Sequence, residues 1–107
     1  MNEATQARVT SFLGLCLRAG RLTTGQEACV EMIRSGAAAL ALIDEGASDN
    51  TRKRLTDACR SHATPLYALP PGALGHSIGK PGRMTAALGP DGMTEKLLEM
   101  LQDQPRL

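Results

Sequence analysis

Hydrophobic and polar positions along the chain switch between helical spacing and short apolar runs. The helical spacing predicts helices over residues 4–19, 24–36, 49–63 and 93–101, with a small one near 72–77. The apolar runs predict strands over residues 37–43, 65–69 and 84–88, with a very short edge strand at 21–23. Because strands alternate with helices, we predict an α/β fold, a three-layer α/β/α sandwich with a mixed four-stranded sheet.

The most informative stretch is the second predicted helix and the apolar run after it. Thr24 is suited to cap the helix, and Glu27, three residues on, completes a capping-box pattern. Gly36 stands where a helix ends in a left-handed turn. The run 37–43 has no polar residue, which is typical of a strand covered on both faces. Gly25 has no side chain, so a ligand could approach the backbone amides of the helix start.

The third predicted helix begins after Ser48, a good N-cap residue. Its inner stripe is predicted to consist of Leu55, Ala58, Cys59 and His62. Its outer face carries Arg52, Lys53, Arg54 and Arg60. Because Asp49 and Asp57 alternate with these basic residues, we interpret them as a solvated helix face.

Length and composition limit the kind of protein. With 107 residues, 42% hydrophobic but only 2% aromatic, the chain predicts one domain over 1–107 with an aliphatic core. We expect residues 1–3 and 103–107 to be frayed. The net charge of +1 provides no global basic field, so nucleic-acid binding would require a local patch. Stacking on unpaired bases has almost no aromatic residues available.

The cysteines and the apolar runs indicate an intracellular protein. Cys16, Cys29 and Cys59 are odd in number and far apart, which favours buried reduced thiols. No apolar run approaches the roughly 20 residues of a membrane span, and the N-terminus lacks a secretory signal. We therefore expect a cytoplasmic protein, and a monomer.

No pattern typical of an enzyme is complete. A P-loop fails because Leu74 stands five residues before Gly79 and Pro81 follows Lys80, where a hydroxyl residue is needed. There is no G-x-S-x-G elbow, and two histidines 14 positions apart provide no metal-site spacing. We expect no catalytic residue, no metal and no cofactor.

A second candidate stretch, LGHSIGKPGR, covers residues 74–83. Its basic residues Lys80 and Arg83 lie on a loop shaped by proline and glycine, with no acid between Leu74 and Arg83. A functional role and a purely structural one are equally supported by this pattern.

Taken together, FLGLCLRAGRLTTG, the IRSG–AAALALI junction and LGHSIGKPGR resemble the ribosomal protein L7-Ae/L30-e superfamily, and within it the bacterial YlxQ-like RNA-binding proteins. The resemblance runs from about Val9 to Leu101. It implies an α/β/α sandwich that binds structured RNA such as ribosomal RNA, often at a kink-turn. It also implies a possible association with the ribosome or with a second small RNA-associated domain.

In this family the start of the second helix and the loop before the last strand grip the RNA together. Transferred to this chain, the first element falls on Gly25, Gln26, Glu27, Ala28 and Glu31, and the second on residues 78–83. With Arg21 and Thr24 from the residues just before, the expected RNA-binding residues are Arg21, Thr24, Gly25, Gln26, Glu27, Ile78, Gly79, Lys80, Gly82 and Arg83. We expect Arg21, Gly25 and the 79–83 loop to lie close together on one side of the sheet.

The chain departs from the kink-turn binders at three positions. Those proteins place Asn and then Glu where this chain has Glu27 and Ala28, and a basic residue where it has Glu31. The polar pair that reads guanines is therefore missing, while Gly25, Gln26, Lys80 and Arg83 still favour RNA. The alternative is a protein-interaction module on the same fold with little RNA affinity; a phosphate-ester enzyme ranks third.

Overall fold

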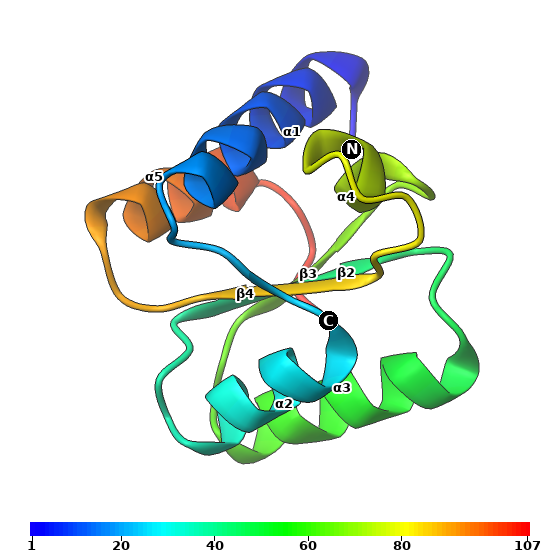
Figure 1. Cartoon of the computed structure of the whole chain (residues 1–107), viewed down its shortest axis with the longest axis vertical. Coiled ribbons are helices and arrows are strands. Elements are labelled where there is room, and N and C mark those ends of the chain that lie inside the picture. The colour runs from blue at the N-terminus through cyan, green and yellow to red at the C-terminus, as the bar shows by residue number, and fades with distance from the viewer.

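The computed structural model describes all 107 residues and has the predicted order of helices and strands. The elements are α1 (Glu3–Arg18), β1 (Thr23–Thr24), α2 (Gln26–Arg34), β2 (Leu40–Asp44), α3 (Asp49–Ser61), β3 (Leu66–Leu69), α4 (Ala73–Ser77), β4 (Thr85–Leu88) and α5 (Gly92–Leu101). Figure 1 shows the sheet between two layers of helices, α1, α4 and α5 on one face and α2 and α3 on the other. The predicted sandwich is confirmed.

The sheet is mixed, with four strands in the order β1-β4-β2-β3. β2 pairs with β3 in parallel and with β4 in the antiparallel sense. β1 adds two residues to the far edge of β4, with Thr24 opposite Ala86. Because β1 and β4 are antiparallel, the end of β1, where α2 begins, lies beside the start of β4.

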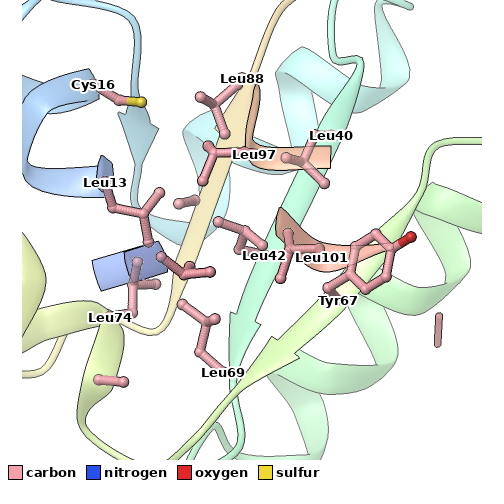
Figure 2. Close-up of a cluster of buried hydrophobic side chains, with 13 residues drawn as sticks. Leu13, Cys16, Leu40, Leu42, Tyr67, Leu69, Leu74, Leu88, Leu97 and Leu101 are labelled. Atoms are coloured by element: carbon pink, nitrogen blue, oxygen red, sulfur yellow. The ribbon is translucent and has the colours of Figure 1, made fainter. Parts of the chain in front are cut away.

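Each face of the sheet has its own aliphatic core. The larger one, against α1, α4 and α5, contains Leu13, Cys16, Leu40, Leu42, Tyr67, Leu69, Leu74, Leu88, Leu97 and Leu101 (Figure 2). The other, against α2 and α3, contains Cys29, Val30, Ile33, Ala41, Ile43, Leu55, Ala58, Cys59, Leu66 and Ala87. Alternate residues of β2 point into the two cores, so every residue of this strand is buried, as predicted.

β2 begins later than the apolar run from Ala37 predicts. The Ala37 N–H donates to Met32 O at 3.1 Å and the Gly36 N–H to Ile33 O at 3.0 Å, while Gly36 has a φ of 80°. These bonds close the C-terminal turn of α2, as expected of a glycine at this position. Ala37 therefore belongs to the helix end, and the ladder starts at Leu40.

α3 has the predicted cap but a shorter C-terminal end. The Ser48 hydroxyl accepts the Thr51 N–H at 3.2 Å, which confirms the N-cap. The helix ends at Ser61 rather than residue 63, and His62 is an exposed C-cap residue with Nδ1 3.1 Å from Ala58 O. The expected place of His62 in the inner stripe is wrong, because the helix has already ended where the periodicity would turn its side chain inward.

The predicted burial of the three cysteines is confirmed. Burial raises the pKa of the Cys16 and Cys29 thiols, and it raises the pKa of Cys59 to about 11. None of the helices is both long and apolar enough to cross a membrane.

Both chain ends are held by hydrogen bonds. The Asn2 side chain accepts the Thr5 N–H at 2.8 Å, and the Leu107 N–H donates to Leu66 O at 2.9 Å. One end thus caps α1 and the other follows the edge of β3, while the fraying expected of residues 1–3 and 103–107 stays a prediction.

Candidate functional site

The start of α2 is capped by a glycine instead of the predicted Thr24. Gly25 is the N-cap residue, with a φ of 98° and no side chain to accept a hydrogen bond. Thr24 lies in the β1–β4 ladder, and Glu27 has no Thr24 cap to complete, so the predicted capping box is wrong. The first-turn N–H groups of α2 consequently have no side-chain acceptor.

The loop before β4 is folded back on α4. The Lys80 N–H donates to Gly75 O at 2.9 Å, and the Arg83 N–H donates to Lys80 O at 3.1 Å. A Cβ on Gly75 would lie 2.9 Å from Lys80 O, so only glycine allows this approach. The loop is thereby held at the edge of the sheet, with Lys80 and Arg83 exposed.

The two predicted loops meet at Gly25. Arg83 Nη1 lies 2.8 Å from the position that a Cβ on residue 25 would take, and the Gly25 N–H donates to Thr85 O at 3.3 Å. A cavity of about 250 Å³ lies between them, lined by Gly25, Gln26, Thr51, Gly82, Arg83, Met84 and Thr85. The expected proximity of Gly25 and the end of the 79–83 loop is confirmed.

α3 contributes two side chains that contact the start of α2. The Thr51 hydroxyl donates to Gln26 Oε1 at 2.6 Å. The Arg54 guanidinium binds both carboxylate oxygens of Glu27, with Nη2 3.4 Å from Oε2. The hydrogen bonds from Arg54, together with its charge, lower the pKa of Glu27. Arg54 thus forms an ion pair across to α2 at the surface, where its side chain is 31% exposed and that of Glu27 is 79% exposed, whereas Lys53 pairs along its own helix, with Asp57 at 2.9 Å.

A buried hydroxyl lies below the cavity. Thr85 is 1% exposed, and its Oγ1 makes no hydrogen bond of good geometry. The hydroxyl lies beside the Cys29 thiol, which itself donates to Thr23 O at 3.5 Å. Thr85 thus connects the wall of the cavity with the core between the sheet and α2.

Other predicted site residues lie away from this cavity. Arg21 pairs with Asp91 at 3.3 Å, beyond the far end of the β1–β4 ladder, so its expected place beside Gly25 is wrong. The reason is that β1 runs as an extended strand between Arg21 and Gly25. Ile78 is 6% exposed, so its side chain packs inward. Gly79 and Lys80 are exposed on the loop but do not line the cavity.

The cavity wall offers hydrogen-bond donors. Arg83 forms no ion pair, the Gln26 oxygen is occupied by Thr51, and the α2 amides point toward the helix start. An arginine, an amide NH₂ and a helix N-terminus all favour ligands with acceptor oxygens or nitrogens, such as phosphate groups and base edges. No three His, Cys, Asp or Glu side chains are grouped so that they could hold a metal ion.

Comparison with known proteins identifies relatives over most of the chain. No protein-family model matches it. The chain is 38% identical over 91 residues to the RNA-binding protein YlxQ of Bacillus subtilis, covering 84% of this chain and 91% of the relative. The chain belongs to the YlxQ family. It is also 31% identical over 103 residues to the RNA-binding protein YlxQ of Enterococcus faecium, covering 95% and 99% of the two chains.

Solved structures confirm the fold of this YlxQ family member. A Bacillus halodurans protein of unknown function superposes with a TM-score of 0.83 at 32% identity, over 91% of this chain and 99% of the other. The Giardia lamblia 15.5kD RNA binding protein superposes with a TM-score of 0.77 at 18% identity, over 95% and 88% of the two chains. The second superposition shows that a protein with only 18% sequence identity has the same fold.

The contribution of α3 to the site is not predicted from the sequence. Thr51 precedes Leu55 by one turn, and Arg54 precedes Ala58 by one turn, so both continue the stripe of α3 that faces the core. That spacing is visible in the sequence once the Ser48 cap sets where the helix begins. What it does not reveal is that α2 lies beside this stripe.

Proposed function

We propose that this protein binds structured RNA, without catalysing a reaction, through the start of α2 and the loop before β4. The observation that supports the proposal most strongly is the approach of the Arg83 guanidinium to Gly25, which joins both loops around one cavity. Two relatives with 31–38% identity are named RNA-binding proteins. A donor-rich wall suits phosphate oxygens and the acceptor edges of bases.

Ribosomal RNA and kink-turn-like RNA are the classes that we propose as targets. Ala28 has no polar group, and the carboxylate of Glu27 is bound by Arg54, so neither presents a free acceptor to a guanine. We therefore expect only a small preference for a kink-turn over a hairpin that lacks the kink. Affinity then depends mainly on phosphate contacts.

Replacing Lys80 and Arg83 together by alanine tests this function. Both cations are exposed and without an ion pair, so they are free to contact phosphates. We expect the double variant to bind a kink-turn hairpin and a bulge-free hairpin about tenfold or more weakly than the parent, by similar factors for both. The measurement is a dissociation constant by fluorescence anisotropy at one fixed salt concentration.

A matched control removes two cations from α1, which lies on the other face of the sheet from α2 (Figure 1). Arg8 and Arg18 on α1 are exposed and form no ion pair, and the variant with both replaced by alanine has the same net charge as the test variant. We expect this control to bind RNA almost as the parent does. Equal affinity of the Lys80/Arg83 variant and the parent would contradict the proposal.

The second candidate function is a protein-interaction module. It is favoured by one surface feature, a shallow hollow on α1 and α5 where Leu15 is 44% exposed between Phe12 and Met100. This hollow is lined mainly by apolar residues, which is unusual for the surface of this chain. If the parent protein fails to bind either hairpin, this alternative becomes the better one.

A further inference from the structure

Both polar side chains in the first turn of α2 are held by one neighbouring helix. Thr51 of α3 binds Gln26, and Arg54, three residues later on the same helix, binds Glu27. Thr51 is itself fixed, because its hydroxyl receives the Ser48 hydroxyl at 3.1 Å and its N–H donates to the same oxygen. The start of α3 therefore supports the start of α2 at two adjacent points.

These contacts determine which hydrogen-bonding groups α2 presents outward. The Thr51 hydroxyl occupies the carbonyl oxygen of the Gln26 side chain, which leaves the NH₂ group as the available donor. Arg54 occupies both oxygens of Glu27 and balances its charge. The Glu27 side chain is 79% exposed, so without Arg54 its carboxylate would stand uncompensated at the helix start, where it would repel a phosphate.

We propose that Thr51 and Arg54 are positioning residues that keep the start of α2 a donor surface for acceptor groups of RNA. This inference rests on the proposed RNA-binding function. Arg54 acts through Glu27, by neutralising it, and Thr51 acts through Gln26, by orienting its amide. α3 thereby supports the interface through two side chains that act on α2.

A double-mutant cycle on the Arg54–Glu27 pair tests the first half. With the kink-turn hairpin as probe, we expect Arg54→Ala to weaken binding about fivefold, because the freed carboxylate repels phosphate. Glu27→Gln should bind at least as tightly as the parent. In the Glu27→Gln background, Arg54→Ala should change the dissociation constant by less than about twofold. This rescue separates a positioning role from a direct phosphate contact.

Lys53→Ala is the matched control for the loss of a cation from α3. Lys53 pairs with Asp57 of its own helix, so we expect little change in RNA binding. Circular dichroism and thermal unfolding of every variant check that the fold is retained. If Arg54→Ala weakens binding equally in both backgrounds, Arg54 contacts RNA directly and the inference is wrong.

Thr51→Val tests the second half, because valine keeps the shape and the N–H that caps α3 but removes the hydroxyl. We expect about threefold weaker binding, and no further loss when Thr51→Val is added to Gln26→Ala. Additive losses would overturn the role assigned to Thr51. Failure of the proposed function looks different: the parent itself would not bind the hairpin, and the inference would fall with it.

Discussion

At the scale of single residues, Gly25 determines how the two loops meet. Its φ of 98° is accessible to glycine at little cost, and Arg83 Nη1 occupies the space of a Cβ. The same position also leaves the α2 start without a side-chain cap. Backbone conformation, cap chemistry and the approach of Arg83 thus depend on the same missing side chain.

Gly25→Ala is expected to have two separable effects. The backbone conformation should lower the free energy of unfolding by about 1–2 kcal/mol, and the new methyl group should displace Arg83 and weaken RNA binding. Gly36→Ala is the control, since Gly36 has a φ of 80° but nothing within 4 Å of its Cβ position. Urea unfolding and RNA titration would show destabilisation of both variants, larger for Gly25→Ala because its φ of 98° and ψ of 141° lie outside the left-handed helical region, but weaker RNA binding for Gly25→Ala only. Equal RNA affinity of the two variants would contradict the assigned role of Gly25.

At the scale of elements, Asp44 links the end of β2 to two connections. The residue is fully buried, and its carboxylate accepts the Gly46 N–H at 2.7 Å and the Gly72 N–H at 2.8 Å. One bond shapes the turn that leads to α3, and the other fixes the turn before α4. The first turn leads to α3, which contacts the start of α2, and the second leads to α4, on which the 79–83 loop is folded. Asp44 therefore stabilises the two turns that position these parts of the candidate site.

We expect Asp44→Ala to lower the free energy of unfolding by about 2–4 kcal/mol, because two hydrogen bonds to a carboxylate are lost. The neighbouring Glu45→Ala, which removes an exposed acid, should stay within about 0.5 kcal/mol of the parent. The measurement is the midpoint of urea unfolding at neutral pH. A midpoint for Asp44→Ala equal to that of Glu45→Ala would show that the carboxylate does not stabilise the turns.

Elements governed by local patterns were the ones that the sequence predicted well. Ser48 as an N-cap and Gly36 as a helix end depend on nearby backbone groups, and both were predicted from residue type and spacing. The Thr24 cap failed because β1 pairs with β4, a contact between residues more than 60 positions apart. The Glu27–Arg54 and Gln26–Thr51 contacts also cross between elements, so helix periodicity could not reveal them.

At the scale of the whole molecule, charge is nearly balanced. The chain has 12 Lys and Arg residues against 11 Asp and Glu residues, and a net charge of +1. Three of the basic residues are neutralised by ion pairs and so are less available to phosphates: Arg21–Asp91, Lys53–Asp57 and Arg54–Glu27. A long-range attractive field for RNA is therefore weak, and any electrostatic attraction must come from the few cations near the site.

This charge distribution predicts a shallow salt dependence of RNA binding. Each phosphate neutralised by the protein releases counterions, so the slope of log association constant against log salt reports the number of such contacts. With Lys80 and Arg83 as the free cations of the site, we expect a slope of about −2. Titration of the kink-turn hairpin at about five potassium chloride concentrations between roughly 50 and 300 mM would measure it. A slope of about −5 or steeper would mean that phosphates also contact basic residues outside the site, and the interface would have to extend beyond the start of α2 and the loop before β4.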